Sequence, residues 1–233
     1  MSEASRPKDI PLGHVNLKEI NRAEHLTSQY ISRSAKQGST GSEEIMQGIH
    51  RRIYTPFCSP STRDQICGVY KSTDNILLRH TYEVTPAIFI GKEMKNFGNE
   101  VDEDIKKIGK VTPENIGDFV DLAAFSHCQL VKHQPFVDGN KRTSRFFVKY
   151  LCLKMGVKTF TFGPIHNPRY NNGVKDYNER KDLDLFKLLI TNMLITEYSI
   201  SDKQEDLPYL YRLGKKKATN ERSMKEKNSK AYT

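Results

Sequence analysis

The stretch QLVKHQPFVDGNKRTSR, residues 129–145, combines residue types that could bind a phosphate. A proline and a phenylalanine come first, an acid, a glycine and an asparagine follow, and three cations stand close behind them. A glycine lets the backbone approach an anion without a Cβ, and the start of a helix offers unpaired N–H groups and a partial positive charge. The pattern therefore predicts a phosphate-binding loop between two helices.

Each polar residue of this stretch has a chemical reason to be there. Asn140 supplies an amide donor and Arg142 a bidentate fork, while Arg145 falls on nearly the same helical face, so that the two guanidinium groups could hold successive phosphates. The carboxylate of Asp138 is expected to bind Mg²⁺ that bridges phosphate oxygens, and Phe136 to anchor the loop in the core. An ordinary solvated turn is the alternative, which the flanking Pro-Phe pair and spaced arginines disfavour.

The elements that must position this loop are mostly helical. Apolar residues recur at helical spacing over 17–33, 43–53, 111–133, 140–155 and 181–198. Thr112 is expected to cap the helix before the loop, with Pro113 in its first turn, and Pro135 requires that helix to end just before it. Residues 68–86 alone resemble strands. The predicted fold class is therefore all-α, a helical bundle with one β-hairpin.

Length and charge patterning suggest one domain with a tail at each end. The 233 residues can bury one ample core. We expect residues 1–44 to form a lead-in with a helix and a Ser/Gly linker, residues 45–200 to form the domain, and residues 201–233 to form a basic, disordered tail. Residues 212–233 carry eight Lys/Arg against two Asp/Glu, and so account for most of the net charge of +9. A solvated tail is favoured over a nucleic-acid arm, because no aromatic residues interleave with the charge.

Composition also favours certain compartments. The sequence has no apolar run long enough to span a membrane, and its first residues lack the apolar core of a signal peptide. Four cysteines without paired metal spacing fit reduced thiols. A cytoplasmic protein is the expectation, and a secreted effector stays an alternative.

The segment QPFVDGNKRTSR resembles the signature of Fic-domain proteins, His-Pro-Phe-x-Asp/Glu-Gly-Asn-Gly/Lys-Arg-x-x-Arg, at every place but the first. The resemblance extends over about residues 45–195, including IHRRIYTPF, GVYK and TPAIFIGKEM before the signature and YNERKDLDLFKLLI after it. It implies a Fic-type helical bundle that transfers the AMP moiety of ATP to a hydroxyl side chain of a target protein. It further implies that a β-hairpin flap, within about residues 75–86, holds the target by strand addition.

The resemblance also assigns residues to roles, position by position. Most of the residues that it implies for binding ATP and Mg²⁺ belong to the signature. The residues that it implies for binding the target belong to the flap, which precedes the signature in the chain. The implied ATP-binding residues are Phe136, Gly139, Asn140, Lys141, Arg142, Arg145 and, lining the adenine pocket, Tyr177; the metal ligand is Asp138, and the flap residues are Leu77, Leu78, Arg79 and Thr85.

The departure from the signature concerns the general base. The family's histidine stands directly before the Pro-Phe pair, whereas this sequence has Gln134 there and His133 one place earlier. A neutral amide cannot accept a proton near neutral pH, so a general-base contribution of about 10²- to 10⁴-fold should be lost. If Gln134 is an insertion, His133 becomes the base. That arrangement needs a π-bulge at the helix end, because one helical step turns a side chain by about 100°.

Several functions therefore stay open. The first is a weakened or inactive protein adenylyltransferase, and the second is a nucleotide-binding or scaffolding protein without a reaction. The Gly-Asn-Lys-Arg segment with Lys141 also resembles the toxin branch of the superfamily, some of whose members are kinases. The inhibitory string Ser/Thr-x-x-x-Glu-Gly/Asn of many relatives does not occur in the sequence. A separate antitoxin-like protein is therefore a possible partner besides the target protein.

Overall fold

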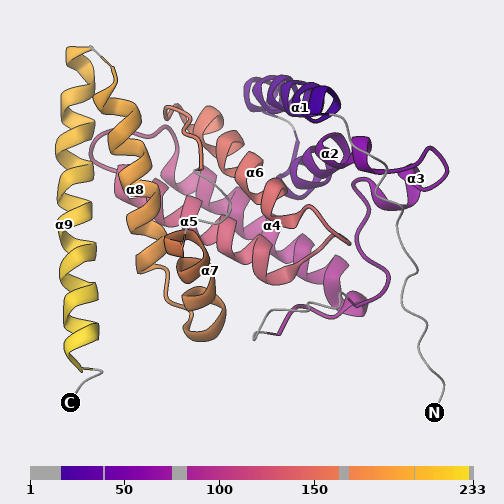
Figure 1. Ribbon diagram of the computed structural model, residues 1–233. Coiled ribbons are helices and arrows are strands. Elements are labelled where there is room, and N and C mark those ends of the chain that lie inside the picture. Colours follow the sequence, from indigo (N-terminus) through magenta and orange to yellow (C-terminus); the bar gives the residue numbers. More distant parts are fainter. Residues whose placement is uncertain (1–16, 39, 75–82, 163–167, 202, 231–233) are drawn as a thin grey trace.

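The computed structural model describes residues 17–38, 40–74, 83–162, 168–201 and 203–230. Every regular element among these residues is a helix (Figure 1). The elements are α1 (Leu17–Gln37), α2 (Ser42–Tyr54), η1 (Thr55–Phe57), α3 (Arg63–Ile66), α4 (Ala87–Ile108), α5 (Ile116–His133), α6 (Asn140–Met155), α7 (Pro168–Arg180), α8 (Asp184–Ser199), η2 (Gln204–Asp206) and α9 (Leu207–Lys230). The helical part of the predicted fold class is confirmed.

The two helices that flank the loop form the centre of the bundle. Helices α5 and α6 pack against each other, α1 and α2 cover α6 on one side, and α7, α8 and α9 cover α5 on the other (Figure 1). Phe119 of α5 and Phe147 of α6 are fully buried, as the apolar spacing of the sequence requires. The loop between α5 and α6 is therefore held by the most buried pair of elements.

Helix α5 begins later than the sequence suggests. Its first residue is Ile116, because Asn115 closes a turn ahead of it by accepting a hydrogen bond from the backbone N–H of Thr112 at 2.7 Å. Thr112 and Pro113 therefore belong to that turn, and the expectation that they cap and open the helix is wrong. The helix ends at His133, two residues before Pro135, as expected.

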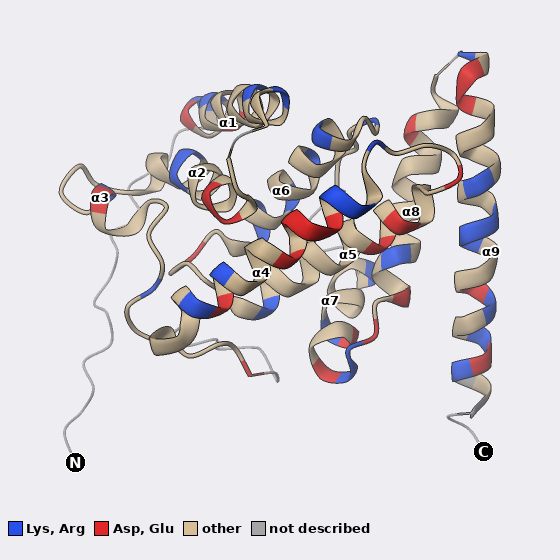
Figure 2. Ribbon diagram, turned by 180° about the vertical axis from the view of Figure 1, so that it is seen from behind, with Lys and Arg blue, Asp and Glu red and all other residues tan. Residues whose placement is uncertain are grey.

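The C-terminal segment is folded where the sequence suggests a disordered tail. Helix α9 packs along α8 and also contacts α5, and its Leu213 is fully buried. Its lysines meet acids of the neighbouring elements, since Lys216 lies 3.0 Å from a carboxylate oxygen of Asp121 and Lys227 lies 2.8 Å from Asp184. Figure 2 shows Lys and Arg residues at several places along α9. Ion pairing and a narrow apolar stripe compensate for the low apolar content that suggested disorder.

The predicted β-hairpin is not seen. The flap residues 75–82, which include Leu77, Leu78 and Arg79, lie outside the described residues. The flanking residues 68–74 and 83–86 contain no strand, and α4 begins directly afterwards at Ala87.

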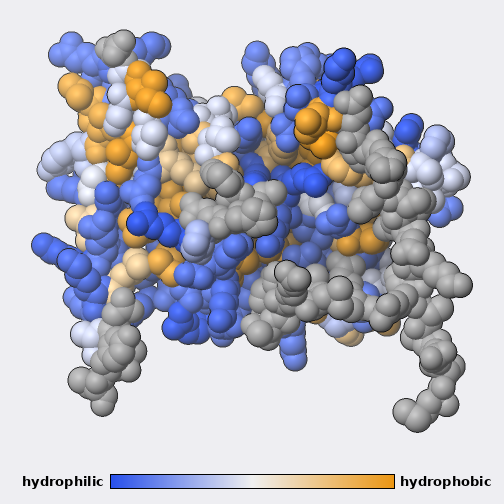
Figure 3. Space-filling model, viewed as in Figure 1, coloured by the Kyte–Doolittle hydropathy of each residue, from blue (hydrophilic) through white to orange (hydrophobic). Residues whose placement is uncertain are grey.

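The surface gives no sign of a membrane span. Among the described residues, no helix is both long and apolar enough to cross a bilayer. Apolar side chains do reach the surface near the turn from α8 to α9 (Figure 3), where Ile200, Leu207 and Tyr211 are exposed.

Candidate functional site

One asparagine holds the loop between α5 and α6 in shape. The side-chain oxygen of Asn140 accepts a hydrogen bond from the backbone N–H of Phe136 at 2.9 Å, and its amide nitrogen donates to the Phe136 carbonyl and to Gln134 Oε1, both at 2.9 Å. Asn140 is buried, so these bonds are shielded from water. Asn140 was predicted to donate its amide to phosphate, but in the structure the amide forms hydrogen bonds within the loop.

Gln134 closes the end of α5 in the left-handed region, at φ 47° and ψ 56°. Its backbone N–H donates to the Leu130 carbonyl at 3.2 Å, and its side-chain nitrogen donates to the Val131 carbonyl at 2.7 Å. The ladder of i to i−4 bonds thus runs to the last residue without a bulge. The side chain of Gln134 reaches toward Asn140 and lies inside the loop.

A stack of two rings, His50 on α2 and Phe136 in the loop, supports the loop. The His50 ring of α2 lies parallel to the Phe136 ring at a centroid distance of 3.9 Å, so Phe136 is the buried anchor that was predicted. His50 Nδ1 accepts from the backbone N–H of Gly68 at 2.8 Å, and Nε2 is 3.0 Å from the Asp138 carbonyl. These two bonds require the neutral ring with its proton on Nε2. Burial lowers the pKa of His50 to about 4, which keeps that form.

The same helix contacts the acid and the glycine of the loop. The Tyr54 hydroxyl donates to a carboxylate oxygen of Asp138 at 3.3 Å. Burial, with the Asp138 charge as the next cause, raises the pKa of Tyr54, so the phenol keeps its proton. Gly139 has φ 76°, and a Cβ there would lie 3.1 Å from the Tyr54 ring. Both the backbone conformation and the available space therefore favour glycine.

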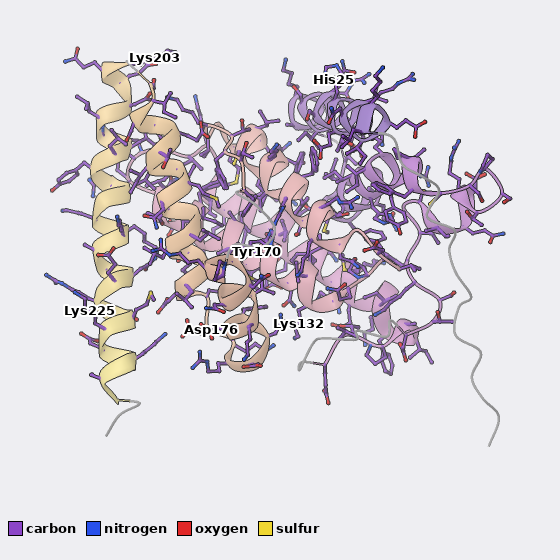
Figure 4. All side chains as sticks on the ribbon, in the orientation of Figure 1. His25, Lys132, Tyr170, Asp176, Lys203 and Lys225 are labelled. Atoms are coloured by element: carbon purple, nitrogen blue, oxygen red, sulfur yellow. The ribbon has the colours of Figure 1, made fainter. Side chains whose placement is uncertain are left out.

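The two arginines lie on aromatic rings. The Arg142 guanidinium carbon is 4.5 Å from the centroid of Phe57, and that of Arg145 is 4.7 Å from Tyr170 and 5.8 Å from Phe162. Tyr170 belongs to α7, in the middle of the molecule (Figure 4), and its hydroxyl lies 2.9 Å from Nε2 of the buried His127. The rings hold the cations in place without using their N–H groups.

Arg145 has unused hydrogen-bonding capacity. Its Nε and Nη2 atoms are buried and find no hydrogen-bond partner in the described part of the chain. The arginines line a cavity of about 200 Å³ together with Glu24, Phe146, Lys149, Thr161 and Phe162. Lys141 adds a further cation near Tyr170, at 6.0 Å from the ring, and burial followed by the Arg145 charge lowers its pKa. The signature cations thus gather on one side of α6.

His133 points away from this cavity. Its Nδ1 is 2.8 Å from the Thr85 hydroxyl, and its ring lies 5.9 Å from the ring of Phe97 on α4. Burial lowers the pKa of His133 to about 4, and the charges of Lys132, Lys71 and Lys181 lower it further. The structure therefore brings Thr85 and His133 together and places Gln134, rather than His133, inside the loop.

Tyr177 is buried one helix further along and donates a hydrogen bond to the side chain of Gln129 on α5. Its assignment to an adenine pocket stays a prediction.

The sequence analysis gave no role to the residues that support the loop and the arginines. His50 and Tyr54 stand four apart within IHRRIYTPF, a spacing that puts both rings on one face of α2. That spacing could have identified the two rings as a pair from the sequence. Phe162 and Tyr170 follow α6 in the chain and gave no signal, because their contacts with Arg145 depend on tertiary packing, which for Tyr170 is that of α7.

Within the loop, Asp138 is the candidate metal ligand. No group of three or more potential ligands that could hold a metal ion occurs among the described residues. The Asp138 carboxylate is exposed, and it already accepts bonds from Tyr54 and from the N–H of Gly139. Mg²⁺ commonly takes one or two carboxylates together with substrate phosphates and water. Asp138 therefore fits Mg²⁺ that arrives with a phosphate.

Comparisons with known proteins include a family match over the loop. Residues 40–152 match the model of the Fic/DOC family. No relative among the curated proteins matches the chain.

Solved structures share the fold. A Fic-domain-containing signaling protein from Bacteroides thetaiotaomicron gives a TM-score of 0.59 at 20% identity, over 89% of this chain and 72% of that one. BepC, a VirB-translocated effector from Bartonella tribocorum with bound AMPPNP, gives 0.54 at 17% identity, over 76% and 88%. Fic-1 from C. elegans gives 0.57 at 18% identity, over 90% of this chain and 53% of that chain, so this chain spans about half of it.

These likenesses establish the fold, and the family match covers the loop and the helices that hold it. Residues 40–152 match the Fic/DOC family model, and the solved structures that share this fold are Fic-domain proteins or effectors.

Proposed function

We propose that the chain binds Mg·ATP at the loop between α5 and α6 and is a protein adenylyltransferase weakened by the lack of a general base. AMP would pass to a hydroxyl side chain of a target protein. Arg145 provides the supporting observation, because two of its buried N–H groups find no partner among the described residues while its guanidinium lies on aromatic rings. A phosphate oxygen in the adjoining cavity would supply that partner and the counter-charge. BepC, which shares the fold, was solved with AMPPNP.

The remaining phosphate contacts would come from the start of α6. The first turn of a helix offers N–H groups to an anion, and Arg142 lies at the same cavity as Arg145. Asp138 would hold Mg²⁺ bound to the phosphates, which supplies charge neutralisation. The N–H of Gly139 and the Tyr54 hydroxyl orient that carboxylate.

The weakness would lie at Gln134, which we place where the family has its histidine. Its amide is bonded at both ends, to Val131 and to Asn140, and an amide cannot take a proton from an attacking hydroxyl. The same observation favours the second candidate function, a nucleotide-binding protein without transferase activity. Neither His133 nor Gln134 would then be catalytic.

Binding is tested first, by calorimetry with Mg·ATP. Arg145→Ala is expected to weaken binding by about 10- to 100-fold, the size of a lost charge-assisted hydrogen bond. Lys154→Ala, on the same helix but outside this cavity, is the matched control and should bind as the parent does. Absence of Mg·ATP binding in the parent chain would contradict the proposal.

Transfer is tested with ATP labelled on the α-phosphate and a proteome extract as the target. Gln134→His is expected to raise labelling by about 10²- to 10⁴-fold, while Gln134→Asn, another neutral amide that tolerates the left-handed region, should not. Binding without label in both the parent and Gln134→His would favour the second candidate function. Strong labelling by the parent that disappears in His133→Ala would instead make His133 the base.

A further inference from the structure

Two cysteines outside the candidate site have their thiols in contact. Cys58 follows η1 and Cys67 follows α3, and their sulfur atoms are 3.2 Å apart. Both are reduced and buried. A disulfide needs a sulfur separation of about 2.05 Å, so a shift of roughly 1 Å would join them. The intervening residues 59–66 form the short segment that carries α3.

A cavity of about 530 Å³ opens onto one member of this pair. It lies between α1 and the segment from α2 to α3, and Cys58 forms part of its wall. Three arginines and one acid line it: Arg22, Arg52, Arg63 and Glu19. Arg52 is fixed there, with its guanidinium 3.7 Å from the Tyr30 ring. The cavity therefore combines a surplus of positive charge with a wall that includes Cys58.

We propose that Cys58 and Cys67 are a redox-active pair, oxidised by a small anionic disulfide such as glutathione disulfide that the arginine-lined cavity binds through its carboxylates. The match is one of charge and chemistry, because a reactive cysteine is typically found in an electropositive, partly accessible site. Two thiols in contact then allow the first product to be resolved within the chain.

The reaction proceeds in two exchanges. The Cys58 thiolate attacks one sulfur of the small disulfide, forms a mixed disulfide and releases one thiolate. The Cys67 thiolate then attacks the Cys58 sulfur, forms the Cys58–Cys67 bond and releases the second thiolate. The two protons of the cysteines end on the two released thiols, so the chain loses two hydrogens and one disulfide is reduced to two thiols.

Burial sets the pace of this reaction. It raises the pKa of Cys58 to about 12, helped by the hydrogen bond with Cys67, while Arg63 opposes the shift. Little thiolate is present at neutral pH, so the exchange is expected to be slow and to speed up with rising pH.

The other two cysteines serve as internal controls. Cys128 of α5 and Cys152 of α6 are fully buried within the core. Neither lines the arginine cavity. They are expected to stay reduced under conditions that oxidise the pair.

Oxidation would reach the loop through the neighbours of the two cysteines. Phe57, next to Cys58, lies under Arg142, and Gly68, next to Cys67, donates to the His50 ring that contacts the Asp138 carbonyl. A change in Mg·ATP affinity on oxidation is therefore expected, and this consequence rests on the proposed function. Formation of the disulfide does not.

The experiment incubates the reduced full chain with glutathione disulfide, alkylates the remaining thiols in denaturant and maps the tryptic peptides by mass spectrometry. Cleavage after Arg63 separates the cysteines, so the product should join peptides 53–63 and 64–71, with Cys128 and Cys152 alkylated. Cys67→Ser should stop at one glutathione per chain, on Cys58. The uncharged 2-hydroxyethyl disulfide should react several-fold more slowly, and Arg63→Ala should slow the reaction with glutathione disulfide alone.

Other results would overturn the inference. Four alkylated thiols after incubation would show that the pair is not oxidised, and equal loss of Cys128 or Cys152 would show general unfolding instead of a site. Equal rates with the two disulfides, unaltered by Arg63→Ala, would remove the role of the arginine cavity. Calorimetry of the oxidised chain is a separate measurement, so a failure of nucleotide binding would leave the peptide result standing.

Discussion

The segment from Gln134 to Arg145 divides into a first half, residues 134–140, and a second half, residues 141–145. The two halves satisfy their polar groups in opposite ways. In the first half, Asn140 bonds to the backbone of Phe136 on both sides and to Gln134. In the second half, Arg145 rests on aromatic rings and leaves two buried N–H groups without a partner among the described residues. The first half therefore has its structure fixed by the protein alone, while the second keeps its capacity for a ligand.

The difference separates residues that shape the site from residues that would bind at it. A buried polar group that already has its partners contributes to stability, and removing it leaves those partners unsatisfied. A cation held by aromatic rings contributes less to stability, and its free donors are available to an anion. Substitutions in the two halves should therefore affect different measurements.

The largest effect is expected for Asn140→Ala. The change removes the two hydrogen bonds to the buried backbone of Phe136 and the one to Gln134, each worth about 1 to 1.5 kcal/mol, so the free energy of unfolding should fall by about 3 to 5 kcal/mol. Urea denaturation measures it. Asn178→Ala on α7 is the matched control, because Asn178 also donates to a backbone carbonyl, that of Val174, but holds no loop.

The contrast between the halves would fail if Arg145→Ala lowered the free energy of unfolding as much as Asn140→Ala does. It would also fail if Asn140→Ala cost no more stability than Asn178→Ala. The first result would mean that Arg145 contributes as much to stability as Asn140 does, and the second that packing holds the loop without the bonds of Asn140.

The sequence located the end of α5 and the Phe136 anchor but not the ring contacts of Arg145, for a physical reason. The residues of the loop are close in the chain, and the end of α5 follows from Pro135 within the same stretch. The ring of Tyr170 reaches Arg145 only after α7 has packed against α5 and α8, and no local pattern encodes that contact. Asn140 could be located from the sequence, but its bonds to Phe136 and Gln134 depend on the left-handed turn at Gln134.

The C-terminal helix shows the same limit in another form. Charge and low apolar content suggested disorder over 201–233, yet α9 forms because Leu213 is buried and Lys216 and Lys227 meet acids elsewhere in the chain. The composition of a segment gives its own charges and apolar residues, but it does not show which residues of other elements will pack against them.

Acid should weaken the support of the first half before it affects the second. Burial lowers the pKa of His50 and of His133 from 6.5 to about 4. The unfolded chain therefore binds these protons first, so the stability is fully present above pH 6.5 and is lost as the pH falls toward 4. The slope is about 1.4 kcal/mol per pH unit for each histidine, or about 2 kcal/mol each between pH 6.5 and 5.

Denaturant unfolding as a function of pH checks this expectation. His133→Gln should remove one histidine's share of the slope, since glutamine can still accept a bond from Thr85 but does not titrate. His25→Gln, at an exposed position of α1 (Figure 4), is the matched control and should leave the curve as in the parent. A parent curve that is flat from pH 6.5 to 5 would contradict the buried neutral state of both rings.

The smallest effect is expected for Tyr170→Phe. This change keeps the ring that contacts Arg145 and removes the hydroxyl, so it tests the two contributions separately. The ring stays under the guanidinium, and the contact of the hydroxyl with His127 Nε2 at 2.9 Å is lost. One neutral hydrogen bond contributes about 1 kcal/mol, so the free energy of unfolding should fall by about that much while Mg·ATP affinity stays within about twofold. Tyr170→Leu removes the ring as well and should weaken Mg·ATP binding further, because the guanidinium then keeps only its longer contact with Phe162. If Tyr170→Phe weakens Mg·ATP binding as much as Tyr170→Leu does, the hydroxyl of Tyr170 and not its ring positions Arg145. The second half of the segment would then depend on hydrogen bonds, as the first half does.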